Sequence, residues 1–158
     1  RWIDALLDRI DPNHSLNSID YYIEPRGQII EAVSWVCLRE GKILCSRSEG
    51  KSLYYIPGGK REEGESETQA LIREIKEELD VQLALESISL LGVFEAQADG
   101  HPIGIQVRLS CYRAGYDGTL KPVSEIRELV WLTYRDRNLV APVDQLVFDF
   151  LRQREELS

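Results

Sequence analysis

The chain has 158 residues, of which 43% are hydrophobic and 29% are charged. This length and composition are typical of a folded globular protein with one substantial core, and they argue against disorder. The formal net charge of −8 argues against nucleic acid and anionic membranes as partners, because both attract clustered Lys and Arg. If the protein handles a phosphate compound, a divalent cation is the obvious source of the missing positive charge.

The first 28 residues are interpreted as an arm that precedes a single domain over residues 29–158. Within residues 2–10 apolar side chains recur at helical spacing, so we expect a short amphipathic helix there. Trp2 is a candidate anchor for this helix, either on the core of its own subunit or in a homodimer.

The cellular compartment can be predicted from targeting segments and from the cysteines. No apolar run reaches the roughly 18 residues of a membrane span. The sequence also lacks the basic region followed by an apolar run that is typical of a signal peptide. Cys37, Cys45 and Cys111 lie far apart, without the spacing of a metal site. We therefore expect a cytoplasmic protein with buried, reduced cysteines.

From residue 29 onward the pattern predicts a strand-rich chain with two longer helices. Strands are expected over residues 29–38, 43–48, 52–59, 88–97, 104–114 and 129–134. The segment 141–157 is expected to close the chain as a helix, with Pro142 near its start and with Leu146, Val147, Phe150 and Leu151 facing inward. This order of elements favours a sheet with helices packed on it.

The segment from Ser66 to Leu79 is predicted to be an amphipathic helix. It contains no Gly or Pro and consists mostly of good helix formers. Ser66 can cap its start, and Leu71, Ile72 and Ile75 fall with Leu79 on one apolar arc. One side of this helix should therefore face the core.

Three glutamates of this helix, Glu74, Glu77 and Glu78, occupy positions i, i+3 and i+4 and so share one side of the cylinder. Like charges at i and i+4 repel by about 0.2–0.5 kcal/mol. In one interpretation Arg73 pairs with Glu77 and the other glutamates are solvated. The other interpretation is a metal site, favoured by flexible backbone at residues 56–59 and by the preference of Mg²⁺ and Mn²⁺ for carboxylate and carbonyl oxygens.

The spacing of these residues resembles the Nudix box, G-x5-E-x7-R-E-U-x-E-E-x-G-U, in which U is aliphatic. The match begins at Gly59, continues through Glu65 and the run 73–78, and ends at Val81, with Asp80 in place of the final glycine. The resemblance implies the α/β/α sandwich of the family, a mixed sheet with packed helices. It also implies a hydrolase that cleaves the pyrophosphate bond of a nucleoside diphosphate linked to another group.

The resemblance further implies a metal site. Glu74, Glu77 and Glu78 would bind Mg²⁺ or Mn²⁺, and the backbone carbonyl of Gly59 would be a further ligand. Glu74 and Glu78 would thereby also take part in catalysis.

The resemblance assigns supporting roles to other charged residues. Arg73 would orient the glutamates through ion pairs, and Glu65 would brace the loop or Arg73. A further acid outside the box would act as ligand or base; Glu125 is the candidate, because it precedes the strand around Trp131, and Glu128 is the alternative. Water would attack one phosphorus in line, with Glu78 or Glu125 as the base.

The resemblance implies that the substrate is a small nucleotide compound, and short sequence similarities narrow this class further. Residues 54–60 resemble the same stretch of MutT-like members, which hydrolyse (d)NTPs, so Tyr55, Gly58 and Lys60 are candidate substrate contacts. Tyr54 or Tyr55 would line a base pocket, or both would belong to the core. A hydrolase of ADP-ribose or of a nucleotide sugar is the alternative, although the downstream markers of ADP-ribose, dinucleoside polyphosphate and NADH hydrolases are absent.

Asp80 is interpreted as a left-handed helix cap, where Gly fits best and Asp is tolerated. The alternative is a shifted loop that weakens catalysis and leaves a Nudix fold used as a ligand-sensing module. His101, in an expected turn, is either a substrate contact or an exposed and inert residue, and His14 has less context still.

Overall fold

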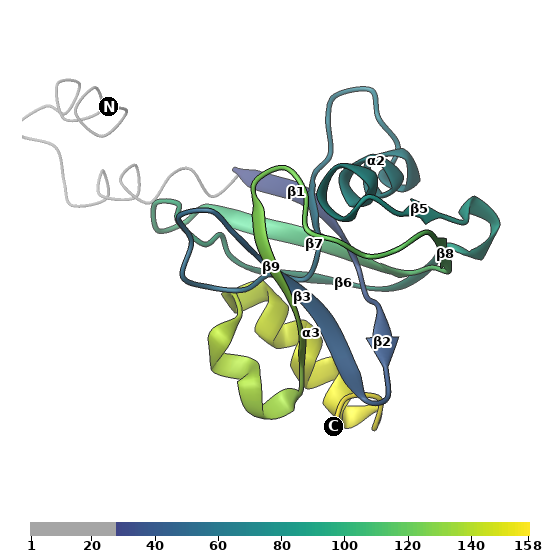
Figure 1. Ribbon diagram of the computed structural model, residues 1–158. Coiled ribbons are helices and arrows are strands. Elements are labelled where there is room, and N and C mark those ends of the chain that lie inside the picture. Colours follow the sequence, from purple (N-terminus) through teal and green to yellow (C-terminus); the bar gives the residue numbers. More distant parts are fainter. Residues whose placement is uncertain (1–27) are drawn as a thin grey trace, which may run out of the picture.

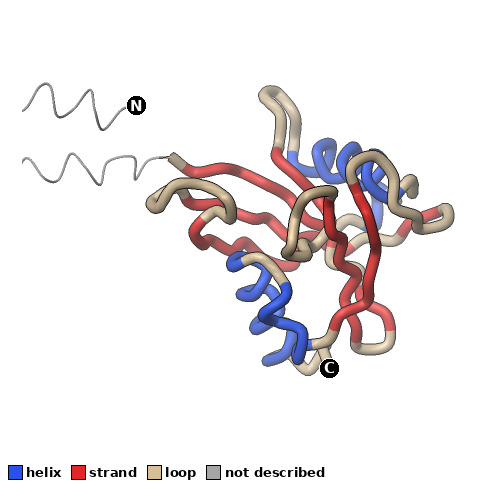
Figure 2. The backbone as a smooth tube through the Cα atoms, turned by 60° about the vertical axis from the view of Figure 1, so that its left-hand side comes forward, coloured by secondary structure: helices blue, strands red, loops and turns tan. Residues whose placement is uncertain are grey.

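The computed structural model describes residues 28–158, in which two main β-sheets lie between two α-helices (Figure 1). The strands are β1 (Ile29–Trp35), β2 (Leu38–Arg39), β3 (Lys42–Ser48), β4 (Gly58–Lys60), β5 (Gln82–Leu83), β6 (Ser89–Gln97), β7 (Gln106–Arg113), β8 (Tyr116–Asp117) and β9 (Ile126–Leu132). The helices are α2 (Glu67–Leu79) and α3 (Pro142–Gln153), with 3-10 turns at Leu85–Ser87 and Tyr134–Leu139. The two α-helices lie on opposite sides of the strands (Figure 2), which confirms the expected α/β/α architecture.

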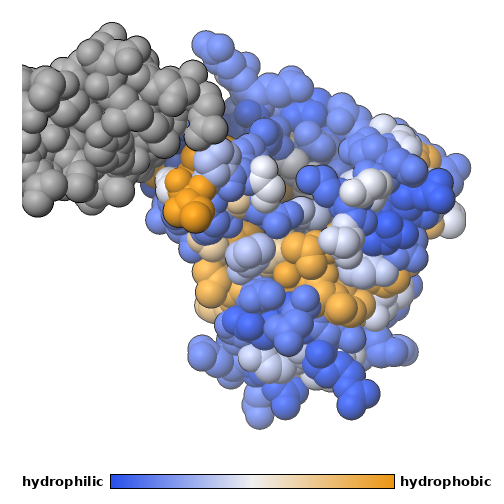
Figure 3. All heavy atoms as spheres, turned by 90° about the vertical axis from the view of Figure 1, so that its left-hand side faces the viewer, coloured by the Kyte–Doolittle hydropathy of each residue, from blue (hydrophilic) through white to orange (hydrophobic). Residues whose placement is uncertain are grey.

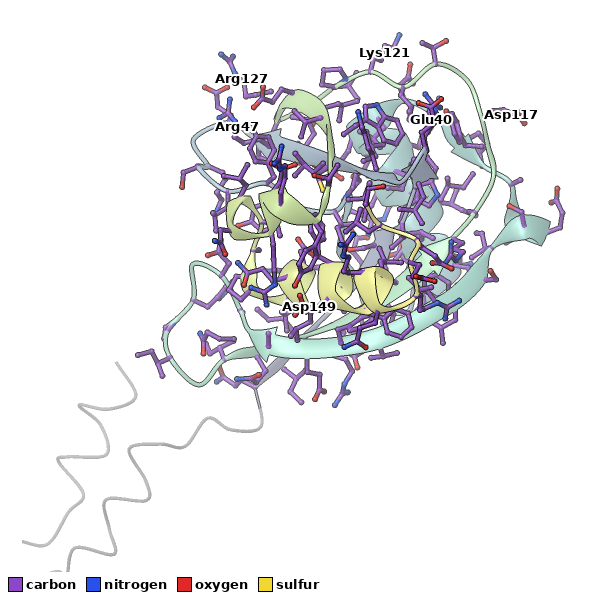
Figure 4. The ribbon with its side chains drawn as sticks, turned by 90° about the horizontal axis from the view of Figure 1, so that it is seen from below. Glu40, Arg47, Asp117, Lys121, Arg127 and Asp149 are labelled. Atoms are coloured by element: carbon purple, nitrogen blue, oxygen red, sulfur yellow. The ribbon has the colours of Figure 1, made fainter. Side chains whose placement is uncertain are left out.

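The larger sheet has the strand order β4-β1-β7-β6 and is mixed, as expected. β1 and β7 run parallel, with Ile29 opposite Gln106 and Trp35 opposite Tyr112, whereas β1–β4 and β6–β7 are antiparallel. The smaller sheet, β2-β3-β9, is antiparallel. Arg47 of β3 and Arg127 of β9 therefore emerge at the same corner of the molecule (Figure 4).

Two strand predictions need correction. The segment 29–38 is not one strand: it leaves the larger sheet after Trp35 and joins the smaller sheet as β2, which forms the hairpin with β3. The segment 52–59 is not a strand either, because Tyr54 and Tyr55 make only isolated bridges and the paired strand starts at Gly58. Pro57, which lacks an N–H, lies between these two parts.

Helix α2 begins and packs as its sequence predicts. The Ser66 hydroxyl accepts a hydrogen bond from the Gln69 N–H at 3.1 Å, and the Gln69 side chain accepts one from the Ser66 N–H at 2.8 Å. This capping box satisfies two backbone donors at the start of the helix. Leu71, Ile75 and Leu79 are fully buried against β1 and the neighbouring strands, so the apolar arc faces the core.

Helix α3 covers the other side of the strands with Val147, Phe148 and Leu151, all fully buried. Leu146 is 38% exposed, so its predicted inward position is wrong. The buried face lies instead on the arc that also carries Val143 and, unexpectedly, the carboxyl of Asp144. Apolar surface also reaches the exterior, where it forms a band between hydrophilic regions on one face (Figure 3).

Asp80 occupies the left-handed position at the end of α2, with φ 55° and ψ 35°. Its carboxylate pairs with Lys76 at 3.0 Å and with Lys121 at 3.2 Å. The segment around Lys121 also donates backbone hydrogen bonds to the carbonyls of Leu79 and Glu78. Asp80 thus keeps the conformation for which glycine is favoured, and it adds ion pairs that glycine could not make.

Replacing Asp80 by Gly should leave the protein nearly as stable as the wild type. Glycine relieves the left-handed backbone but loses two exposed ion pairs, and the two small effects oppose each other. We expect the melting temperature to stay within about 3 °C of the wild type. Asp80→Val, whose branched side chain disfavours this conformation, should lower it by more, and an equal response of the two variants would contradict this account.

Three further predictions concern the cysteines, membrane spans and the first 28 residues. Cys37, Cys45 and Cys111 are buried and unpaired. None of the helices in residues 28–158 is long and apolar enough to cross a membrane. The amphipathic helix predicted for residues 2–10, Trp2 and His14 lie outside the described residues.

Candidate active site

Arg73 connects α2 to the loop that precedes it. Its guanidinium donates to both oxygens of Glu65, at 2.7 and 2.9 Å, and to the carbonyl of Lys60 at 3.2 Å. These bonds lower the pKa of the Glu65 carboxyl to about 2, so Glu65 is ionised at neutral pH. The two-pronged pair fixes the loop against the helix.

The same guanidinium reaches the acids of the helix. Nη1 of Arg73 donates to Glu74 at 3.0 Å and to Glu77 at 3.4 Å. The Glu74 side chain is 17% exposed, whereas that of Glu77 is 55% exposed. Arg73 therefore pairs with Glu77, as the interpretation without a metal site expects. Glu74, however, is not solvated as that interpretation expects, because it is held at the edge of the core.

The two glycines of β4 allow the backbone to approach these acids closely. A Cβ on Gly59 would lie 2.4 Å from Cδ of Glu74, so only glycine leaves room for the carboxylate. Gly58 has φ +155°, and a Cβ there would lie 1.9 Å from the carbonyl oxygen of Val33 on β1. Strand β4 therefore needs glycine at position 58 to pass β1, whereas glycine at position 59 leaves Glu74 in its observed position.

Glu78 is a nearly buried carboxyl, 8% exposed, on the side of α2 that faces β4. Its Oε1 accepts a hydrogen bond from the Gly58 N–H at 3.1 Å. Burial, together with the charges of Glu74, Glu125 and Glu77, raises the pKa of Glu78 to about 8, although the hydrogen bond from the Gly58 N–H opposes this shift. Three acids thus lie close enough to Glu78 to disfavour its ionised form.

The further acid predicted from the resemblance had two candidates, and they lie in different surroundings. Glu125 lies near the end of α2, because the Val123 N–H, two residues earlier, donates to the Glu78 carbonyl at 3.0 Å. Burial is the main cause that raises the pKa values of Glu74 and Glu78, and the charge of Glu125 adds to both shifts. Glu128 instead accepts hydrogen bonds from Arg47, at 2.9 Å, and from the Tyr54 hydroxyl. Of the two, the structure brings only Glu125 towards the acidic helix.

No three His, Cys, Asp or Glu side chains within residues 28–158 converge closely enough to hold a metal ion as they stand. The contacts above give the physical reason. Glu74 and Glu77 turn towards Arg73, and Glu78 turns towards the Gly58 N–H. The oxygen donors are suitable for Mg²⁺ or Mn²⁺, but a shared ligand position requires side-chain rotation.

A cavity of about 460 Å³ opens beside the acidic helix. Glu78, Gly58, Gly59 and Lys60 line one part of it, and Tyr55 also belongs to its wall. This volume suits a small-molecule ligand. The structure therefore brings the predicted substrate contacts and part of the acidic helix to one cavity.

Other polar residues of this cavity were not predicted. Asp144, on α3, and Asp99, between β6 and β7, both line it, and the Tyr55 hydroxyl donates to Asp99. A signal for Asp144 was present, because helical spacing places it with Val147 and Leu151 on the inward face. His101 is exposed and also lines the cavity, so it remains a candidate contact.

Comparison with known proteins defines the family. The family model described as NUDIX domain matches residues 29–152. A CTP pyrophosphohydrolase of Escherichia coli K12 is 32% identical over 109 residues, which span 66% of this chain and 76% of that protein. The solution structure of the E. coli ORF135 protein superposes with a TM-score of 0.62 at 29% identity, covering 79% of this chain and 91% of that one. A MutT NUDIX hydrolase of Burkholderia pseudomallei gives 0.59 at 26% identity, covering 73% and 90%.

The chain belongs to the Nudix family. It is a pyrophosphohydrolase, an enzyme that acts on phosphoanhydride bonds. This result confirms the resemblance inferred from the spacing between Gly59 and Val81.

Proposed function

We propose that the protein hydrolyses the pyrophosphate bond of a nucleoside triphosphate, or of a modified nucleotide, with Mg²⁺ or Mn²⁺. The observation that carries the proposal is the continuity of Glu78, Gly58 and Gly59 with a cavity large enough for a nucleoside. The CTP pyrophosphohydrolase relative supports a nucleoside triphosphate in particular.

In this proposal Glu74, Glu77, Glu78 and the carbonyl of Gly59 hold the metal. The proximity of Gly59 to Glu74 and the unfavourable clustering of negative charge around Glu78 fit such a role. When bound, the metal neutralises phosphate charge and makes the phosphorus more electrophilic.

Other residues of the chain position the reaction. Arg73 and Glu65 hold the loop and the helix in register, and Lys60 lies beside the phosphates at the cavity wall. Glu125 takes the proton from the attacking water, with Glu78 as the alternative. In residues 28–158 no hydrogen bond or ion pair engages the Glu125 carboxylate, which leaves it available as a base.

The test is a panel of substrates assayed for phosphate-bond cleavage with Mg²⁺ and with Mn²⁺. It contains the (d)NTPs, oxidised dGTP, ADP-ribose, nucleotide sugars and dinucleoside polyphosphates. The proposal expects nucleoside triphosphates to have the highest kcat/KM. Faster turnover of ADP-ribose or of a nucleotide sugar would replace the proposed substrate, and binding without turnover across the panel would favour the sensing module.

Mg²⁺ should raise the melting temperature, and more so at pH 8.5 than at pH 6.5. A metal must displace the proton from Glu78, whose pKa is raised to about 8, so binding strengthens as pH rises through that value. At about 100 times the Kd, a ligand stabilises the folded state by about 2.7 kcal/mol. Thermal melts with NaCl at matched ionic strength supply the control, and an unchanged melting temperature at millimolar Mg²⁺ at both pH values would contradict the metal site.

A further inference from the structure

A second hollow, of about 420 Å³, lies outside the active-site cavity and shares no lining residue with it. It opens between the smaller sheet and the chain that follows β8, and we call it the β8 hollow. Figure 1 shows β2 and β8 on one side of the molecule and the β6–β7 connection, which lines the active-site cavity, on the other. The wall of the β8 hollow combines one cation, two aromatic rings and apolar side chains: Arg39, Tyr116, Trp131, Leu44, Leu120 and Leu129.

The guanidinium of Arg39 is held in place from two sides. Its carbon atom lies 4.8 Å from the centre of the Trp131 ring, and its Nη2 donates to the Tyr116 hydroxyl at 2.7 Å. Tyr116 in turn packs edge-on against Trp35, which is fully buried. The guanidinium is therefore fixed before a ligand arrives, which lowers the entropic cost of binding.

Most of the binding capacity of Arg39 is unused. A guanidinium has five N–H donors, and within residues 28–158 the Tyr116 hydroxyl is the acceptor that Arg39 meets, with no carboxylate paired to it. Arg47, Arg73 and Arg137, in contrast, each pair with a carboxylate. Arg39 can therefore bind an anion from solution through the remaining donors of its planar fork.

The surroundings of Arg39 favour an anion as well. The chain has a net charge of −8, yet among the described residues no Asp or Glu lines the β8 hollow. A neighbouring hollow of about 460 Å³ shares Arg39 and Tyr116 with it, adds Arg113, and again has no acid in its wall. The two hollows thus form a locally positive surface on an acidic protein, which attracts anions.

The β8 hollow also suits a flat ring. Trp131 and Tyr116 are half-buried, so part of each ring remains open to a ligand. Leu44, Leu120 and Leu129 add apolar surface beside them. Nucleobases stack on aromatic side chains and on guanidinium planes, and this contact tolerates any base. The combination of rings and a cation therefore fits a ligand that joins a base to a phosphate.

We infer that the β8 hollow is a second nucleotide site, which binds a nucleoside monophosphate. Its phosphate accepts hydrogen bonds from the unused N–H groups of Arg39, and its base packs against Trp131, Tyr116 and the apolar wall. The choice of ligand rests on the proposed function, because cleavage of a nucleoside triphosphate to pyrophosphate releases this compound. The acids of α2 take no part in this second site.

The test follows the indole N–H signals by NMR while the metal-free protein is titrated with CMP and with AMP. The Trp131 signal, assigned with Trp131→Phe, should shift and saturate at millimolar nucleotide. Trp35 is the internal reference, because it is buried and its indole N–H donates to the Ala114 carbonyl, so its signal should move less. Cytidine and inorganic phosphate, the two parts of CMP, should each bind at least about tenfold more weakly than CMP. Equally tight binding of either part alone would overturn the inference.

Arg39→Gln should weaken the binding of CMP at the Trp131 signal by at least about tenfold, because it removes a charge-assisted contact to the phosphate. Its kcat for nucleoside triphosphates should stay at the wild-type value. Arg127→Gln is the control, since Arg127 lies on β9 like Trp131 but is exposed and pairs with Glu49 at 3.1 Å; it should keep the wild-type Kd.

Two failures can be told apart. A Trp131 signal that does not move, or an equal Kd in the wild type and Arg39→Gln, would overturn the second site while the proposed function stands. Absence of turnover for every nucleoside triphosphate, with the Arg39-dependent shift of Trp131 intact, would refute the proposed function and support the second site.

Discussion

Glu78→Gln is expected to lower kcat by at least about a hundredfold while the protein stays folded. Among the acids of α2, Glu78 is the one that is both nearly buried and part of the cavity wall, so in the proposed site its charge would meet the phosphates most directly. Loss of a group that binds metal or moves a proton commonly costs two to four orders of magnitude. The amide oxygen of Gln can still accept the Gly58 N–H, which preserves the local structure. Steady-state kinetics with saturating Mg²⁺ measures the effect.

The same variant should be more stable than the wild type at pH 8.5 without metal. The folded-state pKa of Glu78 is raised to about 8 from 4.5, so the folded state binds an extra proton between these values. The free energy of unfolding of the wild type therefore falls as pH rises through this range, and Gln removes the loss. Glu63→Gln, an exposed change in the loop before α2, should alter neither property. Turnover close to the wild type in Glu78→Gln would remove Glu78 from the site.

The second large effect is expected from the two glycines of β4, which should respond differently to alanine. In Gly59→Ala the new methyl group meets the Glu74 carboxylate, the end of a flexible side chain. The side chain can move away, so the protein should fold. In the proposed site Glu74 holds the metal, and a displacement of about 1 Å at such a group can cost about a hundredfold in rate. In Gly58→Ala the methyl group meets the backbone of Val33 and Ser34, which cannot move without breaking the β1–β4 pairing.

We expect Gly58→Ala to lose about 3 kcal/mol or more of the free energy of unfolding. Denaturant unfolding and kcat, measured on both variants, separate the two responses. Gly50→Ala is a suitable control, because nothing lies within 4 Å of a Cβ there although its φ is also positive. If Gly59→Ala kept full activity, Glu74 would not need its position beside the β4 backbone.

Local features of the site could be predicted because they depend on neighbours in sequence. The start of α2 at Ser66, its apolar arc and the left-handed Asp80 all follow from propensity, helical periodicity and capping. The family followed from the spacing within one helix and its preceding loop. These features are confirmed by the fold and by the family match.

Features that depend on contacts between distant segments could not be predicted. Residues 29–38 read as one strand, but the chain changes sheets after Trp35, and no local pattern marks that crossing. Asp144 meets Ile56, 88 residues earlier, and Tyr55 meets Asp99 across 44 residues. Only the packing of α3 and of the β6–β7 loop around the cavity brings these residues together.

The most direct test of the central claim is identification of the products formed from CTP at pH 8.5 with Mg²⁺. The account predicts CMP and pyrophosphate in equal amounts, formation that stops when the metal is chelated, and almost none from Glu78→Gln. Release of inorganic phosphate with CDP, or equal product formation by wild type and Glu78→Gln, would contradict a pyrophosphohydrolase site built on the acids of α2.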